Sequence, residues 1–130
     1  MTRETLRECR KNSKVIARLR ERIERLWSNA EGGKQGFSTA YSHANPGSEK
    51  IPVQVGVIME LEKECLRKTE EYADVRGEVE LWVLSLPKRL GEVAKLWVLD
   101  GAELRAMALE MVITEGSCRK HIARIYERCL

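Results

Sequence analysis

Cationic and apolar side chains alternate with helical spacing near the C-terminal end of the chain. The apolar positions are Cys118, Ile122, Ile125 and Cys129, at intervals of four, three and four residues, which predicts a helix that buries one face. The opposite face would carry Glu115, Gly116, Arg119, Lys120, Ala123 and Arg124. Three of these six are long cations, which can reach phosphates or the acceptor edge of guanine. The pattern therefore indicates a helix that binds DNA.

A second amphipathic helix is predicted directly before this one, from about residue 102 to residue 111. Its apolar positions Leu104, Met107, Ala108 and Met111 have helical spacing, and the small Ala108 lets the next helix cross closely. Together the two segments predict a helix-turn-helix whose second helix, about residues 115–130, lies in the major groove.

The candidate DNA-binding residues are Thr114, Glu115, Ser117, Arg119, Lys120, His121 and Arg124. Thr114 can cap the second helix by accepting a hydrogen bond from a free backbone amide. Arg119 is the candidate for base readout, because its planar fork can bond both acceptors of guanine. Lys120 and Arg124 are expected to hold phosphates, with Thr114 and Ser117 supporting them. His121 is expected to be half-buried, with a phosphate contact within its reach.

Another helix, from Lys88 to Leu99, would complete a three-helix unit over residues 87–130. Ser85 is a candidate cap for this helix, Pro87 suits its first turn, and Gly101 is expected to reverse the chain at its end. Residues 87–130 hold eight basic and six acidic residues, a net charge of +2. This charge is small for a protein that binds DNA alone, so we expect dimerisation or recruitment by another protein to add affinity.

Residues 1–86 predict two long helices, about 3–30 and 53–86, that pair as an antiparallel coiled-coil hairpin. Residues 1–30 carry a net charge of +5 and residues 31–86 carry −4, so pairing would offset charge. The basic first helix is compatible with nucleic-acid contact or with a solvated arm, and we favour the solvated arm. A Gly- and Ser-rich loop at about residues 31–52 is expected to be mobile, with Phe37 and Tyr41 as its candidate contact residues. Gly77 is expected to be a soft point in the second helix.

The composition favours an all-α protein and offers little for catalysis. The cysteines lack the close spacing of zinc ligands, and His43 and His121 are far apart, so we expect neither a metal nor a cofactor. No nucleophile has a placed base, so we expect no enzyme activity. The N-terminal residues lack the apolar region of a secretory signal, and no apolar run reaches the length of a membrane span. We therefore expect a soluble protein in the cytoplasm.

The segment ITEGSCRKHIARIYERCL resembles the recognition helix of LuxR-type regulators and of sigma-factor region four. The matching residues are Thr114, Glu115, Gly116, Ser117, Arg119, His121 and Ile122, while Cys118 stands where Val is usual. The upstream stretch LWVLDGAELRAMALEM is similar to the family's entry into the first helix, although Glu103, Leu104 and Arg105 replace a Ser and two acids.

The order of the predicted elements is similar to that of the phage-encoded regulators of the RinA/ArpU type. This resemblance implies transcriptional control of phage or prophage genes in a bacterial host, with host RNA polymerase as a candidate partner and the arms for oligomerisation. The alternative is a non-enzymatic phage protein that docks protein, or that binds DNA during packaging as small terminase subunits do.

Overall fold

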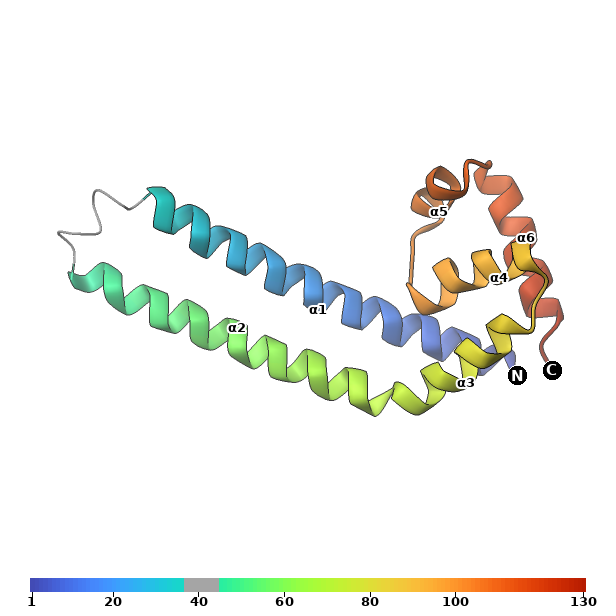
Figure 1. Ribbon diagram of the computed structural model, residues 1–130, viewed down its shortest axis with the longest axis horizontal. Helices are drawn as coiled ribbons and strands as arrows, with labels where there is room; N and C mark the ends of the chain where they lie inside the picture. The colour runs from blue at the N-terminus through green and yellow to red at the C-terminus, as the bar shows by residue number, and fades with distance from the viewer. Residues whose placement is uncertain (37–44) are drawn as a thin grey trace. The chain divides into compact units, whose positions relative to one another are not determined.

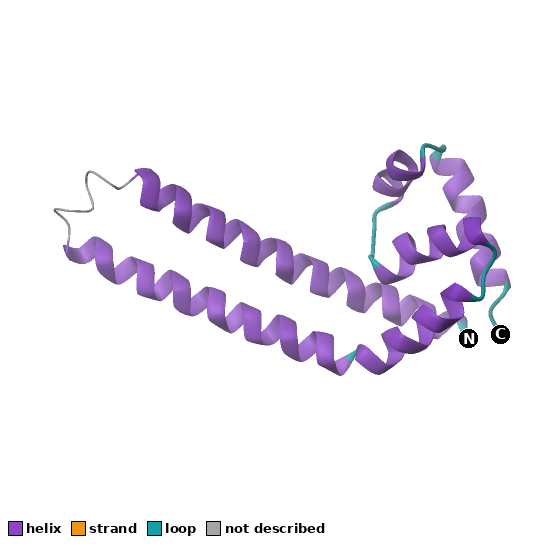
Figure 2. Ribbon diagram, in the orientation of Figure 1, coloured by secondary structure: helices purple, strands orange, loops and turns teal. Residues whose placement is uncertain are grey.

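A computed structural model describes the backbone of residues 1–36 and 45–130, and the side chains of residues 1–29 and 54–130. All regular secondary structure in these residues is helical, which confirms the predicted all-α class (Figures 1 and 2). The elements are α1 (Arg3–Gly36), α2 (Asn45–Glu71), α3 (Ala73–Leu84), α4 (Lys88–Ala94), the π-helix η2 (Lys95–Leu99), α5 (Leu104–Met111) and α6 (Glu115–Glu127).

The chain divides into two compact units that differ from the two predicted segments. Unit 1 comprises residues 1–17 and 69–130, and unit 2 comprises residues 18–68. The predicted boundary at residue 86 therefore lies inside unit 1. The reason is that Leu6 and Cys9, at the start of α1, belong to the same hydrophobic core as the C-terminal helices. The first turns of α1 are thus part of the unit that holds α5 and α6.

The core of unit 1 draws on every helix from α3 onward as well as on α1. Its largest fully buried side chains are Leu6, Val79, Val93, Val98, Met107, Cys118 and Ile125. Burial of one aliphatic side chain of this size contributes about 1.5–3 kcal/mol relative to exposure. Because each helix contributes at least one of these side chains, loss of any helix would expose part of the same core.

Two arginines from other helices fix the junction between η2 and α5. The Arg10 Nη1 group donates to the carbonyl oxygens of Trp97 at 2.5 Å and Ala102 at 2.9 Å, and Arg76 Nη1 donates to the Leu99 oxygen at 2.9 Å. The Arg10 guanidinium carbon also lies 3.2 Å from the centre of the Trp97 ring. Burial lowers the pKa of Arg10, and the negative charge of Glu103 opposes that effect. The bonds to Trp97 and Leu99 satisfy carbonyl groups that the end of η2 leaves without internal partners, and the bond to Ala102 engages the loop that follows η2.

Gly101 reverses the chain after η2, as its sequence position predicted. Its φ of +65° is in the left-handed region, which glycine adopts without the steric cost of a Cβ atom. A Cβ added at Gly101 would also lie 3.1 Å from the backbone nitrogen of Lys14. The close approach of α1 and the positive φ therefore both require glycine here.

Helix boundaries around α3 correct two sequence predictions. The predicted helix 53–86 is interrupted at Tyr72 (φ −100°, ψ 4°) and not at Gly77, which lies inside α3. After the interruption, α3 buries Val79 and Val83 in the core of unit 1. Ser85 does not cap α4: its hydroxyl donates to the Trp82 oxygen, and Pro87 occupies the cap position without a side-chain bond.

The predicted loop at residues 31–52 is also corrected at both ends. Helix α1 continues to Gly36 and α2 begins at Asn45, so helix replaces loop over much of this range. A glycine in a helix costs only about 1 kcal/mol, and Pro46 lies in the first turn of α2, where proline is tolerated, so these residues do not force a break. Pro52 lies further inside α2, where a proline removes one backbone hydrogen bond and disfavours a straight helix. Residues 37–44, which include the predicted contact residues Phe37 and Tyr41, lie outside the described residues.

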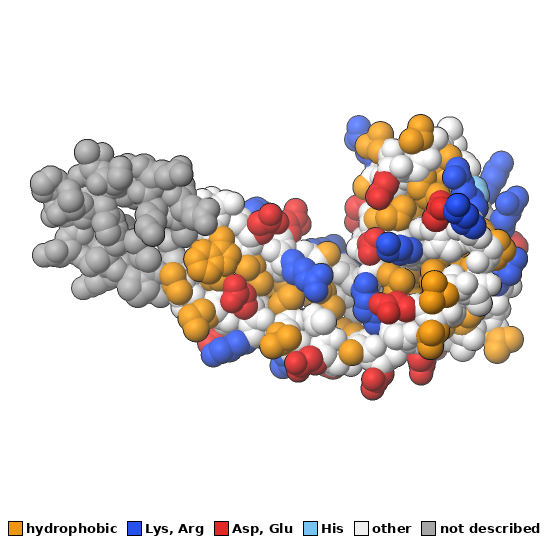
Figure 3. Space-filling model, in the orientation of Figure 1, with side chains coloured by type: hydrophobic (Ala, Val, Ile, Leu, Met, Phe, Trp, Pro, Cys, Tyr) orange, Lys and Arg blue, Asp and Glu red, His pale blue; other side chains and the backbone are white. Residues whose placement is uncertain are grey.

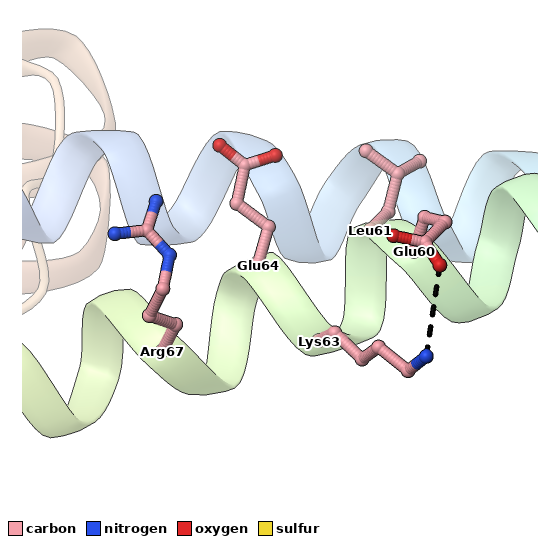
Figure 4. A pocket seen from close by; sticks show the side chains of 5 residues that line it. All are labelled: Glu60, Leu61, Lys63, Glu64 and Arg67. Atoms are coloured by element: carbon pink, nitrogen blue, oxygen red, sulfur yellow. Dashed lines mark ion pairs between the residues drawn. The ribbon is translucent and has the colours of Figure 1, made fainter.

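Within unit 2, α1 and α2 lie side by side, and the Trp27 Nε1 group of α1 donates to Glu62 Oε1 of α2 at 3.3 Å. The buried face of α2 includes Ile58, Leu61 and Cys65. A surface hollow on α2 is lined by Glu60, Leu61, Lys63, Glu64 and Arg67 (Figure 4). Lys63 pairs with Glu60 at 3.6 Å, and none of the lining residues is a predicted site residue.

No helix in the described parts of the chain combines the length and the apolar character needed to cross a membrane.

Candidate nucleic-acid interface

A three-residue turn of Val112, Ile113 and Thr114 connects α5 to α6. Val112 adopts a left-handed conformation (φ 55°, ψ 47°), and the Ile113 N–H donates to the Ala108 oxygen at 3.1 Å. The Thr114 hydroxyl oxygen accepts from the Ser117 N–H at 3.1 Å, which confirms the predicted cap. The turn thus fixes the start of α6 relative to the end of α5.

The inner face of α6 packs on α4 and α5. Cys118 and Ile125 are fully buried, and Ile122 and Cys129 are half-buried, so the predicted apolar stripe is confirmed. Burial raises the pKa of the Cys129 thiol, which donates to the Ile125 oxygen at 3.6 Å. Because this stripe determines the rotation of α6 about its own axis, it also determines which side chains face solvent.

The outer face of α6 is exposed at every position that the sequence predicted to face outward. These positions are Glu115, Gly116, Arg119, Lys120, Ala123 and Arg124. Figure 3 shows Lys and Arg side chains gathered over α6. Arg119, Lys120 and Arg124 form no ion pair with any residue whose side chain the structure describes. Their charges are therefore available for an anionic ligand.

His121 and Ser117 lie beside this face and are half-buried. The His121 Nδ1 atom lies 2.7 Å from the Ser117 carbonyl oxygen. Because a carbonyl only accepts, Nδ1 must carry the hydrogen, and Nε2 is an acceptor in the neutral ring. A bond from His121 to a phosphate therefore requires the protonated ring. Thr114 and Ser117 act mainly at the start of the helix, where the cap bond engages the Thr114 oxygen.

Two further cations beside α6 were not among the predicted site residues. Arg3 Nε donates to the Tyr126 carbonyl oxygen at 3.2 Å, and the Arg7 guanidinium carbon lies 5.7 Å from the centre of the Tyr126 ring. The Leu130 N–H also donates to the Met1 oxygen at 2.9 Å. One sequence signal pointed to these cations, the net charge of +5 in residues 1–30, and we interpreted it as a solvated arm. No local pattern relates the start of α1 to α6.

The described residues contain no group of three or more His, Cys, Asp or Glu side chains able to hold a metal ion. Cys9, Cys65 and Cys118 are buried, and burial raises the pKa of Cys9. No family model, no curated protein and no solved structure matches the chain.

Proposed function

We propose that this protein is a sequence-specific DNA-binding regulator of transcription. In this proposal α5 and α6 form a helix-turn-helix, and α6 enters the major groove. The observation that carries the proposal is the exposed face of Arg119, Lys120 and Arg124 on a helix whose opposite face is buried. An exposed cationic helix that follows a short turn has the form that groove-reading helices share.

Arg119 and Lys120 have different roles in this proposal. The planar fork of Arg119 bonds both acceptors of a guanine and supplies sequence preference. Lys120 and Arg124 hold phosphates and supply affinity that does not depend on sequence. The resemblance of residues 113–130 to LuxR-type and region-four helices supports these roles. The separate similarity in the order of elements to regulators of the RinA/ArpU type makes phage or prophage genes the expected targets.

Helices α1 and α2 form an antiparallel coiled-coil hairpin in this proposal, for oligomerisation or for contact with host RNA polymerase. Trp27, Met59 and Leu66 are 40%, 51% and 60% exposed, which is apolar surface that a second copy would cover. A dimer would also double the number of cations at the DNA. Analytical ultracentrifugation at micromolar concentration should show a dimer or a larger species, and a monomer throughout that range would remove this part of the proposal.

The proposed roles are tested by substitution in α6 and measurement of DNA affinity over a salt series. Arg119→Ala should cost about 1–3 kcal/mol at the specific site and relax its sequence preference. Lys120→Ala should weaken binding to all sequences and reduce the salt slope by about one unit. Arg25→Ala is a matched control, because Arg25 is an exposed cation in unit 2. Unchanged affinity for both α6 variants would refute DNA reading by this helix.

A second candidate function is protein docking in phage assembly or in DNA packaging of the small-terminase kind. Leu109 and Val112 favour it, because they are 74% and 88% exposed and lie three residues apart at the end of α5. An apolar surface of this kind fits a protein partner better than it fits DNA. Leu109→Glu would abolish such docking and leave the proposed DNA contacts of α6 in place. A promoter that responds to the protein favours the regulator.

A further inference from the structure

We propose that the DNA-binding surface extends onto the first two turns of α1, where Arg3 and Arg7 bind phosphates beside the C-terminal end of α6. This inference rests on the proposed DNA-binding function and adds a second element to it. The sequence pattern alone favoured a solvated arm for α1. The contacts of α1 with Tyr126 change that interpretation for its first two turns.

The orientation of α1 at this point is fixed by its buried side. Leu6 and Cys9 are 0% and 4% exposed and lie in the core of unit 1. Arg3 and Arg7 are four residues apart, so they lie on one face of the helix, and both are exposed. Glu4 and Glu8 each follow an arginine by one residue and therefore point about 100° further around the helix. The two arginines thus share a face that these two carboxylates do not occupy.

The same two arginines lie beside the flank of α6 that carries Arg119. Arg119 and Tyr126 are seven residues apart, which is close to two full turns, so they lie on one side of α6 about 10 Å apart along its axis. Arg3 and Arg7 contact Tyr126. Arg119 at one end and Arg3 and Arg7 at the other therefore form a row of cations about 10 Å long. At 3.4 Å per nucleotide, this length matches about three nucleotides of one DNA strand.

The contacts with Tyr126 leave both guanidinium charges available. Arg3 uses Nε for the Tyr126 oxygen, and Arg7 lies near the Tyr126 ring. A guanidinium has five N–H donors, so most of them remain for a second acceptor. Within the described side chains, neither arginine forms an ion pair. Arg3 also stabilises the negative end of the α6 dipole, and this interaction does not neutralise its guanidinium charge.

Arg3 and Arg7 would add positive charge to C-terminal helices that carry little of it. Residues 87–130 carry a net charge of only +2. The proposed phosphate contacts of α6 are few, and affinity for DNA rises with the number of phosphates that a protein neutralises. Two arginines from α1 would therefore increase affinity without a change in sequence preference.

The test compares two double variants that remove the same charge. One is Arg3→Gln with Arg7→Gln, and the control is Arg18→Gln with Arg25→Gln, on exposed positions of α1 in unit 2. Affinity for a selected DNA site and for scrambled DNA is measured from 50 to 300 mM KCl. The first variant should lower the salt slope by about 1.8 and weaken both DNAs by about 10- to 30-fold at 0.15 M salt. The control should change neither quantity.

A charge-preserving variant separates phosphate binding from a structural role. Arg3→Lys with Arg7→Lys keeps both charges and should bind DNA within about threefold of the natural protein, because a phosphate accepts a point charge. An equal loss in the Lys and Gln variants would show a structural role and overturn the inference. An equal loss in the Gln variant and the unit 2 control would also overturn it. If Arg119→Ala weakens DNA binding and the Arg3 and Arg7 variants do not, this inference is refuted and the proposed function stands. If the natural protein binds no DNA, the proposed function is refuted as well.

Discussion

Val112 provides a prediction with an unusual sign, because its replacement by glycine should stabilise the protein. Val112 has φ 55° and ψ 47°, in the left-handed region. This conformation costs an L-residue about 1–2 kcal/mol, and a β-branched side chain is among the least suited to it. The side chain is 88% exposed, so its removal loses very little buried area.

The magnitude follows from two opposing terms. Val112→Gly removes the steric cost of about 1–2 kcal/mol, which stabilises the folded protein. The greater freedom of glycine in the unfolded chain destabilises the folded protein by about 0.5–1 kcal/mol. The two terms leave a net stabilisation of about 0.75 kcal/mol, within a span of about 0–1.5 kcal/mol, and the midpoint should raise the melting temperature by roughly 2–5 °C in a domain of this size. Thermal unfolding followed by circular dichroism and urea unfolding at 25 °C both measure it.

Ala106→Gly is the matched control, because Ala106 is an exposed residue inside α5. There glycine has no strain to relieve and should destabilise the protein by about 1 kcal/mol. If Val112→Gly lowers the melting temperature as Ala106→Gly does, then Val112 does not carry the strain inferred from its backbone. Val112→Asn offers a second check, since asparagine tolerates the left-handed region and should also stabilise.

Three further predictions concern unit 1. Arg10→Ala removes two bonds to backbone carbonyls and a ring contact, so urea unfolding should show a loss of about 2–4 kcal/mol. Arg10→Lys should recover only part of this loss, because an ammonium lacks the planar fork. Thr114→Ala should cost about 1 kcal/mol through loss of the cap, and amide hydrogen exchange should accelerate in the first turn of α6. In site-resolved alkylation of the folded protein, Cys129 should react first and Cys118, which is fully buried, should react only on unfolding. At pH 8 the Cys129 reaction should be slower than that of a free thiol, because burial raises its pKa.

Features that depend on neighbouring residues in sequence were predictable. The Thr114 cap and the buried positions Cys118 and Ile125 need only the spacing within one helix and the residue before it. The exposed cations of α6 follow from the same spacing. Gly101 was also predictable, since a glycine after a helix commonly reverses the chain.

Features that depend on distant packing were not predictable. The interruption at Tyr72 precedes α3, which buries Val79 and Val83 in unit 1, and no local signal marks Tyr72 as a break. The placement of Leu6 in the core of the C-terminal helices depends on contacts more than seventy residues apart in sequence. Val112 was missed for a different reason, because a valine does not indicate a left-handed turn. The contacts of Arg3 and Arg7 with Tyr126 depend on the same long-range packing.

The central claim is that the outer face of α6 reads DNA sequence, and selection of binding sites from a pool of random double-stranded DNA tests it most directly. The natural protein should enrich one motif that contains a guanine required for binding. The Arg119→Ala and Lys120→Ala double variant, with an unchanged melting temperature, should enrich none. Enrichment of the same motif by both proteins would contradict the claim, as would the absence of any motif with the natural protein.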